Sequence, residues 1–290
     1  MNDKIIQDFL STKIDSINDY SEEEVAQIKK EFFDKNKDVI TSELTFRERE
    51  YTLEGKKFSL CCSAPEIALA DDTTLSETRF KYGKNTHRVP VEFVVLMESI
   101  IRKNEREQGV FRKPANSKKK KECEELFFSS VKGRFDMEQL IKELDQFDAI
   151  VLSSIFKQLF SRSYVSIFPT SFFKIIKKVM VMDDLENKFI ITKYLIYSVP
   201  PINRALLEST LSFLILIHDI DSDRGLDYEG HLDIKGYGTI IMPNLFLGFE
   251  KNVTFRDLAD LADYAGYLMI HIKELLDIKT EKLNRPHMSH

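Results

Sequence analysis

The chain has 290 residues, of which 43% are hydrophobic and 31% are charged, and its formal net charge at pH 7 is −5. This composition excludes a disordered chain, and it suffices for one domain of ordinary size plus an extension. The three cysteines lack metal-ligand spacing and two of them are adjacent, which argues against a disulfide framework and favours reduced thiols.

Charge is distributed unevenly along the chain. Residues 1–75 contain 10 Lys and Arg against 17 Asp and Glu, whereas the remaining residues carry a net charge of +2. Residues 79–121 hold 13 basic and four acidic residues. A field of this sign can steer an acidic or phosphate-bearing partner, although a run such as residues 118–121 is usually a solvated helix face.

The acidic N-terminal segment predicts one helix and a small hairpin. Ser21 and Glu24 have the spacing of a capping box, which predicts a helix from residue 22 to about residue 35. Aromatic and β-branched residues on both sides of Gly55 indicate a hairpin within residues 42–70. The polar residues 71–74 are interpreted as a linker, so residues 1–75 form an N-terminal extension.

Helical spacing of apolar residues dominates the rest of the chain. Pro90 suits the first turn of a helix, where its missing N–H costs nothing, and apolar positions follow it. The same spacing recurs in residues 126–128, 137–144, 150–160, 172–181, 190–197, 206–217 and 258–276. Only 10 glycines and eight prolines interrupt the sequence, so a turn-rich β domain is disfavoured. The pattern predicts an all-α helical bundle.

Several other classes of protein and site lack support. Residues 1–10 do not have the pattern of a secretory signal, and the most apolar stretch, residues 211–217, is too short to cross a bilayer. We therefore expect a cytoplasmic protein with no integral membrane segment. No nucleotide-binding glycine loop and no Ser/His/Asp set is visible.

Residues 219–225 invite a calcium interpretation because they contain three aspartates. An EF-hand loop needs glycine at its sixth position and glutamate at its twelfth. This segment has Arg224 and Gly230 there. We therefore expect no metal site, and we interpret the flanking His218 and His231 as structural.

Four short motifs follow one another in the second part of the chain. Residues 109–112 are Gly-Val-Phe-Arg, residues 148–157 are Asp-Ala-Ile-Val-Leu-Ser-Ser-Ile-Phe-Lys, residues 199–203 are Val-Pro-Pro-Ile-Asn, and residues 242–245 are Met-Pro-Asn-Leu. In this order and spacing they resemble the RhoGAP family, the GTPase-activating domains that act on Rho-type small GTPases. The resemblance spans residues 76–278 and leaves residues 279–290 as a C-terminal tail. It implies a RhoGAP-like helical bundle with a short N-terminal extension.

The resemblance also implies a catalytic arginine. Arg112 matches the arginine finger of the family's Gly-hydrophobic-Phe-Arg loop, in which Gly109 permits a tight or positive-φ backbone and Phe111 anchors the loop. Such a finger acts in trans, so the protein would activate a partner GTPase and would not be an enzyme alone. A guanidinium suits the task because it is always charged and its donors match phosphoryl oxygens.

Further site residues carry over from the same motifs. Asp148 and Lys157 match the ends of the family's Asp-x-His-x-x-Ala-x-Leu-Leu-Lys helix, and Lys157 would support the finger loop and contact the GTPase. The remaining expected partner contacts are Lys113, Arg162, Lys235 and Asn244. Pro200, Asn203 and Pro243 are expected to be structural, with Asn203 capping a long helix.

The expected partner is a Rho-, Rac- or Cdc42-type GTPase, which would recruit the protein to membranes. GTP and Mg²⁺ would belong to this partner, so the resemblance implies no cofactor of the protein's own. We expect no nucleic-acid partner, and a monomer is the default.

The sequence departs from the family pattern at two positions. Ser161 occupies the place of a family arginine, and Arg162 is displaced from it by one residue. Gly236 stands where the family has an asparagine that contacts the GTPase, so either Lys235 or Tyr237 substitutes or this surface binds differently.

These departures keep two alternatives open. The first is a RhoGAP-like module that binds a GTPase, or another signalling partner, with weak activation or none. The second is a scaffold that works through its acidic residues 1–75. The presence of Arg112 favours activation.

Overall fold

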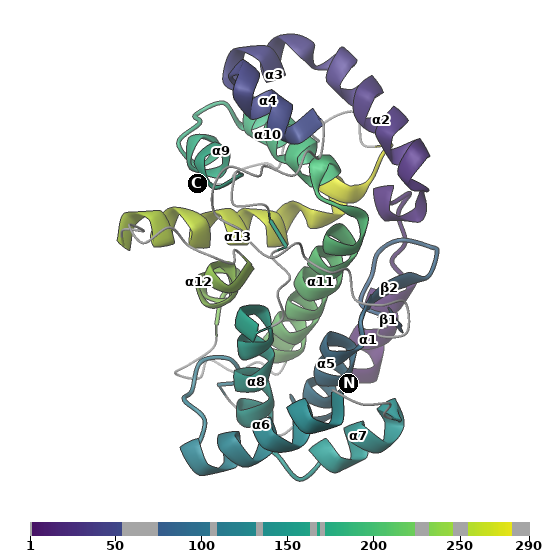
Figure 1. Ribbon diagram of the computed structural model, residues 1–290, viewed down its shortest axis with the longest axis vertical. Coiled ribbons are helices and arrows are strands. Elements are labelled where there is room, and N and C mark those ends of the chain that lie inside the picture. Colours follow the sequence, from purple (N-terminus) through teal and green to yellow (C-terminus); the bar gives the residue numbers. More distant parts are fainter. Residues whose placement is uncertain are drawn as a thin grey trace.

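The chain folds into a bundle of helices with one small hairpin (Figure 1). The computed structural model describes residues 2–53, 75–104, 109–131, 136–162, 167–168, 172–223, 232–245 and 255–279. These residues contain thirteen α-helices, one 3-10 helix and one two-stranded sheet. The predicted all-α fold is therefore confirmed for the described part of the chain.

The N-terminal extension is helical. It comprises α1 (Asn2–Ser11), the 3-10 helix η1 (Ile17–Asp19), α2 (Glu22–Lys35), α3 (Lys37–Glu43) and α4 (Phe46–Leu53). The predicted capping box is present at the start of α2, because the Glu24 N–H donates to the Ser21 hydroxyl and the Ser21 N–H donates to the Glu24 carboxylate. This helix ends at Lys35, as expected.

The predicted hairpin is wrong where the structure describes it, because α4 occupies Phe46–Leu53. The remainder of that prediction, residues 54–70, lies outside the described residues. The reason is a second capping box: the Glu48 N–H donates to the Thr45 hydroxyl, and the Thr45 N–H donates to the Glu48 carboxylate at 2.8 Å. Thr45 and Glu48 have the same spacing as Ser21 and Glu24, so the sequence contained this signal.

The observed hairpin follows the undescribed segment. Strands β1 (Leu75–Thr78) and β2 (His87–Pro90) pair antiparallel, with Leu75 opposite Pro90. Pro90 therefore ends a strand, where its missing N–H is tolerated, and the predicted helix α5 (Val91–Asn104) begins one residue later.

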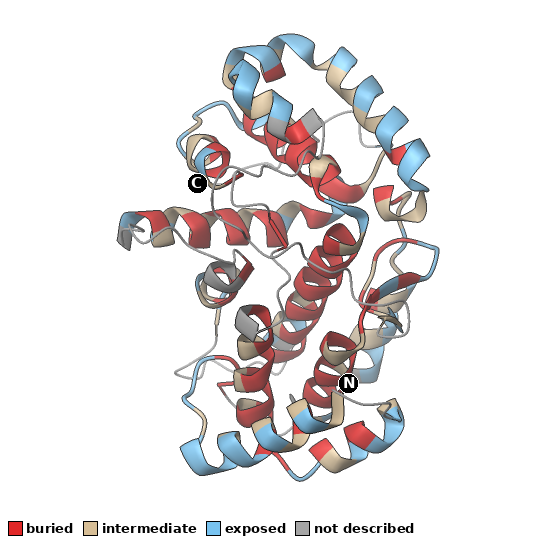
Figure 2. Ribbon diagram, viewed as in Figure 1, coloured by how far each residue is buried: buried red, intermediate tan, exposed pale blue. Residues whose placement is uncertain are grey.

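Eight further helices complete the bundle. They are α6 (Ser117–Val131), α7 (Met137–Leu144), α8 (Ala149–Arg162), α9 (Phe172–Met180), α10 (Leu185–Ser198), α11 (Pro201–Asp223), α12 (Ile234–Leu245) and α13 (Phe255–Leu276). Helix α11 lies at the centre, and residues 203–214 of it are buried on every side (Figures 1 and 2). Because this stretch includes Arg204 and Glu208, the core must supply polar partners.

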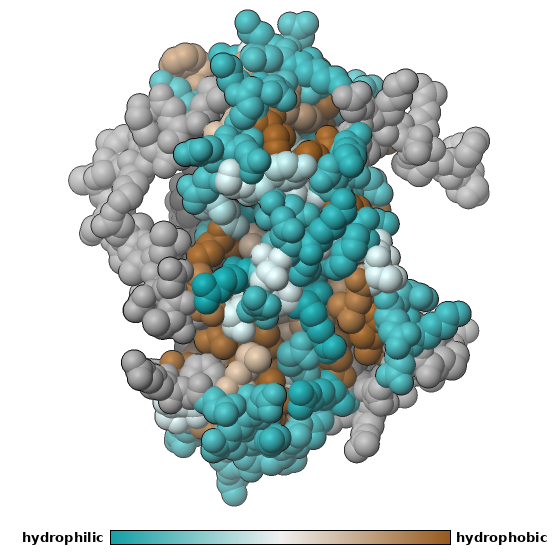
Figure 3. All heavy atoms as spheres, turned by 90° about the vertical axis from the view of Figure 1, so that its right-hand side faces the viewer, coloured by the Kyte–Doolittle hydropathy of each residue, from teal (hydrophilic) through white to brown (hydrophobic). Residues whose placement is uncertain are grey.

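The N-terminal helices pack onto the bundle and share its core. Phe32 and Phe33 of α2 contact Tyr197 and Tyr194 of α10, with ring centroids 5.4 and 6.0 Å apart. Figure 1 shows α2, α3 and α4 covering one end of the molecule beside α10. Figure 3 shows the face on the right of Figure 1, where hydrophilic side chains predominate and hydrophobic patches lie between them. The extension thus buries aromatic surface of the bundle.

A buried polar network joins the extension to α11. The Asn18 amide nitrogen donates to Glu208 at 2.6 Å, and the Asn18 amide oxygen accepts from the Arg204 guanidinium at 2.6 Å. The other oxygen of Glu208 accepts the backbone N–H groups of Tyr82 and Gly83 at 2.7 and 3.2 Å. Each buried charge of α11 therefore has a partner outside α11.

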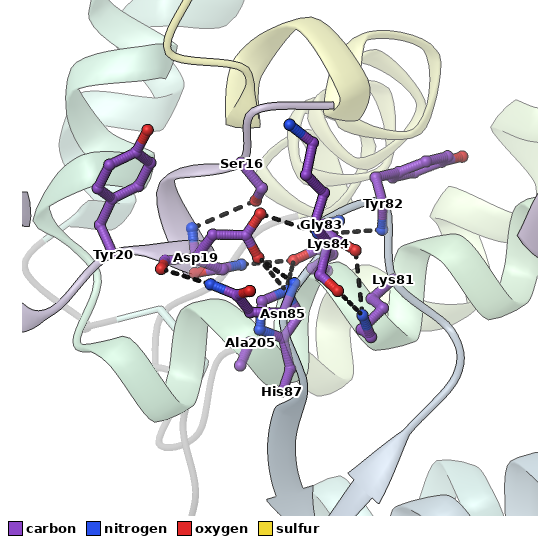
Figure 4. Close-up of polar contacts among 12 residues, drawn as sticks. Ser16, Asp19, Tyr20, Lys81, Tyr82, Gly83, Lys84, Asn85, His87 and Ala205 are labelled. Carbon is purple, nitrogen blue, oxygen red and sulfur yellow. Dashed lines mark hydrogen bonds and ion pairs between the residues drawn. The ribbon is translucent and has the colours of Figure 1, made fainter. Parts of the chain in front are cut away.

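Asp19 extends this network to the segment before β2. Its carboxylate accepts the backbone N–H groups of Lys84 and Asn85 at 2.8 and 3.0 Å, and the Asn85 amide donates back to the Asp19 carbonyl (Figure 4). The buried His87 ring lies between the two carboxylates, with its Nε2 3.3 Å from Glu208 and 3.7 Å from Asp19. Residues 18–19 and 82–87 are thus joined to α11 and to each other by the same few side chains.

Candidate functional site

The loop between α5 and α6 ends in a tight turn that starts at Gly109. The Gly109 carbonyl accepts the N–H groups of Arg112 at 3.0 Å and Lys113 at 2.9 Å. Gly109 has a φ of +83°, a conformation that glycine adopts without the steric cost that a side chain adds. The observed backbone is the positive-φ turn that the sequence predicted.

Phe111 has a left-handed backbone as well, with a φ of +68°. Its side chain is 1% exposed and meets the rings of Phe156, Phe213 and Tyr237, at centroid distances of 5.9, 6.1 and 6.1 Å. These three rings belong to α8, α11 and α12. A non-glycine residue in this region costs about 1–3 kcal/mol, and it persists only where its surroundings fix it.

Helix α8 binds both backbone polar groups of Phe111. The Phe111 N–H donates to the Ser153 hydroxyl at 3.2 Å, and the Lys157 ammonium donates to the Phe111 carbonyl at 3.0 Å. Ser153 and Lys157 are four residues apart and therefore share one face of the helix. Burial lowers the pKa of Lys157, and the charge of Lys120 acts in the same direction.

Asp148 determines where α8 begins. Its carboxylate accepts the Val151 N–H at 2.8 Å, which is the bond of an N-cap residue. Asp148 also lies 3.8 Å from the ammonium of Lys119 on α6. This cap sets the start of the helix that presents Ser153 and Lys157 to the turn.

Two exposed basic residues follow the buried Phe111. Arg112 and Lys113 both project into solvent. The basic run at residues 118–121 lies on α6, where two of its lysines form exposed ion pairs, Lys118 with Glu122 and Lys121 with Glu125. That run is thus in part the solvated helix face that its composition indicated.

The N-terminus of α12 lies beside the turn, because Tyr237 packs on Phe111. Asp233 caps this helix by accepting the Gly236 N–H at 2.6 Å. Of the two neighbours of Gly236, Tyr237 is fully buried, whereas Lys235 is exposed and pairs with Asp263 at 2.6 Å. Lys235 is therefore the one that a partner can reach, and Tyr237 belongs to the core.

The remaining residues expected from the motifs lie at the start of α11, in α12 and at the end of α8. Pro200 directly precedes α11, and Asn203 is the third residue of that helix, not its cap. The Asn203 amide donates to the Ile167 carbonyl at 3.4 Å, so it tethers the segment after α8. Pro243 and Asn244 lie in α12, and Arg162 ends α8.

The side chains of Arg162, Pro243 and Asn244 lie outside the described residues, as do Gly230 and His231. His218 is partly buried, with its ring 6.3 Å from that of Tyr237. Within the described residues, no three His, Cys, Asp or Glu side chains gather as metal ligands. None of the helices in that part of the chain combines the length and hydropathy that crossing a bilayer requires.

Two contacts of the structure, those of Ser153 and Asn18, were not expected from the motifs. Ser153 occupies the position at which the family pattern has alanine, four residues before Lys157, and a hydroxyl at this position was the available signal. Asn18 carried no comparable signal, because its partners are 186 and 190 residues away in the sequence.

The fold and the site define an all-α domain that displays an arginine on a braced loop. A scan against protein families matches the RhoGAP domain over residues 90–248. The chain belongs to the RhoGAP domain family, and membership implies a Rho-family GTPase as partner.

Solved structures agree on the fold. The BH domain from GRAF, the GTPase regulator associated with focal adhesion kinase, is 13% identical, with a TM-score of 0.51 over 64% of this chain and 94% of that one. Human Rho GTPase activating protein 15 is 17% identical, with a TM-score of 0.53 over 64% of this chain and 83% of that one. A comparison with curated protein sequences finds no match.

Proposed function

We propose that this protein is a GTPase-activating protein for a Rho-type small GTPase and that Arg112 is its arginine finger. The observation that carries the proposal is the pairing of an exposed Arg112 with a locked Phe111. The ring of Phe111 points into the core while α8 binds its N–H and its carbonyl. The next side chain in the turn is therefore displayed from a fixed backbone.

The proposed chemistry is electrostatic. Intrinsic GTP hydrolysis is slow because the charge that develops on the transferred phosphoryl group is incompletely stabilised, and an arginine supplied in trans is worth about 10³–10⁵ in rate. The guanidinium of Arg112 would enter the partner's active site, where GTP and Mg²⁺ are held by the partner. The protein thereby completes another protein's active site, and it would do so in the cytoplasm or at the membrane to which its partner is bound.

Lys157 has a positioning role in this proposal. Its ammonium donates to the Phe111 carbonyl, so its charge is directed at the backbone beside Arg112. Lys113 is exposed in the turn, and Lys235 is exposed in the first turn of α12. We assign both to contacts with the GTPase surface. Arg162 and Asn244 complete the proposed contact set.

Binding without activation is the second candidate. It is favoured by Gly236, which has no side chain to replace the family's asparagine, and by the burial of Tyr237 beside it. Under this alternative, the surface around α12 recognises a GTPase while Arg112 adds nothing to the rate.

The deciding experiment measures phosphate release from GTP-loaded Rho-, Rac- and Cdc42-type GTPases with wild-type protein, Arg112→Ala and Arg112→Lys. We expect wild type to accelerate at least one GTPase. Both variants should lose about 10³-fold or more of that acceleration while still binding the GTP-loaded partner. Arg47→Ala, which removes an exposed arginine on the remote helix α4, is the matched control.

Two outcomes would contradict the proposal. Binding by wild type without acceleration would establish the recognition module instead. Acceleration that survives in Arg112→Ala would transfer the finger role to another residue.

A further inference from the structure

We propose that Ser153 is a positioning residue for the arginine finger, and that its hydroxyl holds the turn in the conformation that presents Arg112. This inference rests on the proposed function, because it deepens the same site. The hydroxyl sits where the family pattern has alanine. In this chain, the Ser153 hydroxyl therefore gives the Phe111 backbone a second contact, besides the one from Lys157.

The helix that carries Ser153 fixes the position of its hydroxyl. The side chain is 1% exposed, and its hydroxyl donates to the Ile150 carbonyl one turn earlier at 3.0 Å. That bond directs the oxygen lone pairs away from the helix, where one accepts the Phe111 N–H at 3.2 Å. Because its proton is committed to Ile150, the hydroxyl faces the turn as an acceptor.

The backbone conformation of Phe111 needs this contact. A left-handed backbone at a bulky residue is strained and needs several contacts to be retained. Here the ring lies among three aromatic side chains, the carbonyl binds Lys157, and the N–H binds Ser153. Removing the Ser153 hydroxyl leaves a buried donor unpaired, which favours other turn conformations by about tenfold or more.

The conformation of the turn affects the rate of GTP hydrolysis through Arg112. Arg112 follows Phe111 directly, so a rotation of the Phe111 backbone displaces the start of the Arg112 side chain. A misplacement of about 1 Å in a catalytic group can reduce the rate by about 10²-fold. The Ser153 side chain is 1% exposed, so it is not itself part of the surface that a GTPase would contact. Loss of the hydroxyl should therefore lower the maximal rate and leave binding nearly unchanged.

The test compares wild type with Ser153→Ala and with Ser153→Cys, which keeps the side-chain size but offers only a weak acceptor. Single-turnover hydrolysis is measured across a range of protein concentrations, with the GTPase that wild type activates best. We expect the maximal rate to fall about tenfold in both variants while the half-saturating concentration changes less than twofold. Ser154→Ala, on the adjoining half-buried position of α8, should match wild type.

Amide hydrogen exchange of the full-length protein, measured without any GTPase, provides a second readout. The Phe111 amide should exchange about tenfold faster in Ser153→Ala than in wild type, while amides of the central helix α11 keep their protection. A uniform loss of protection would instead show general destabilisation by Ser153→Ala. The same exchange comparison in Ser153→Cys, which keeps the side-chain size, would then decide whether the Phe111 amide is released selectively.

The inference would be overturned by Phe111 exchange equal to wild type in both Ser153 variants, or by a change in half-saturation at an unchanged maximal rate. Failure of the proposed function looks different. Wild type would then accelerate no GTPase, which removes the catalytic part of the inference, while the exchange measurement still decides whether Ser153 holds the turn.

Discussion

Phe111 determines which way its neighbours face. Its positive φ turns the ring into the core between α8, α11 and α12, and the adjacent Arg112 is left in solvent. An arginine on an unbraced loop would lose more conformational entropy on entering a partner's active site than one on a fixed backbone. The strain at Phe111 is thus consistent with a loop shaped for presentation, because strained residues concentrate at functional sites.

Asn18 joins two of the buried charged residues of α11. It contacts Arg204, which is 1% exposed, and Glu208, which is fully buried. Burial lowers the pKa of Arg204 to about 10, so the guanidinium is charged at neutral pH and needs its acceptors. We expect Asn18→Ala to lower the free energy of unfolding by about 2–4 kcal/mol, because it removes a partner from each buried charge.

Denaturant unfolding at pH 7 measures this effect. Asn187→Ala, at a half-buried position on α10, is the control and should change stability by less than about 1 kcal/mol. If Asn18→Ala proves as mild as this control, the network contributes little to stability.

At the scale of elements, the end of α13 is held by a lysine from α10. The Lys193 ammonium is buried and donates to the carbonyls of Glu274 and Asp277 at 3.0 and 2.7 Å. Burial lowers its pKa to about 8, although the carboxylates of Asp277 and Glu274 oppose the shift. Between about pH 8 and the ordinary lysine value, the unfolded chain keeps a proton that the folded chain has released, so this group makes stability rise with pH.

We therefore expect wild type to gain about 1 kcal/mol over Lys193→Met between pH 7 and pH 9. The measurement is denaturant unfolding of both proteins at each pH. The exposed Lys30→Met is the control for the loss of one lysine side chain. A gap between wild type and Lys193→Met that stays constant across this range would mean that Lys193 releases no proton there.

Elements with a local chemical cause were predictable from the sequence, and those with a distant cause were not. The capping residues of α2 and α8 lie within a few residues of the groups they bind, and the amphipathic spacing of later helices is a local property as well. The β hairpin at residues 75–90 and the network around Asn18 depend on groups more than 100 residues away, such as Glu208. No local pattern encodes that proximity.

The residues of the candidate site also differ in whether the sequence could predict them. The motif of Arg112 and the position of Lys157 were visible, because they match short patterns in a fixed order. The hydroxyl at position 153 was a visible departure from the family pattern, but its contact with Phe111 and the burial of Tyr237 were not visible, because each depends on the packing of α8 and α12 around Phe111. A short pattern specifies which residues are present, and only packing decides which of them reach the surface.

At the scale of the whole molecule, the N-terminal extension and the bundle share one hydrophobic core. Residues from α1, η1, α2 and α3 belong to the same buried cluster as those of α10 and α11. The residues after α1 and after α13 also meet, because the Ile278 N–H donates to the Asp15 carbonyl at 3.0 Å. The charge pattern predicted that residues 1–75 are a separate extension. Their residues share the core of the bundle, so they are part of the structure that supports the site.

A chain that begins at residue 76 tests this dependence. It lacks Phe32 and Phe33, which cover the α10 tyrosines, and Asn18, which joins Arg204 to Glu208. Leaving a buried polar group without its partner costs about 1–3 kcal/mol, and more for a charged group, and a domain of this kind has about 5–15 kcal/mol in total. We expect the shortened chain to aggregate or to melt at least 10 °C below the full chain, as measured by circular dichroism.

A chain that lacks only residues 280–290 is the matched control, because it keeps the Ile278 contact with Asp15. Its melting temperature should equal that of the full-length protein. A shortened chain from residue 76 that melts at the full-length temperature, and that activates the same GTPase equally well, would contradict the prediction. Residues 76–278 would then fold and work alone, and the extension would be free to serve a separate partner.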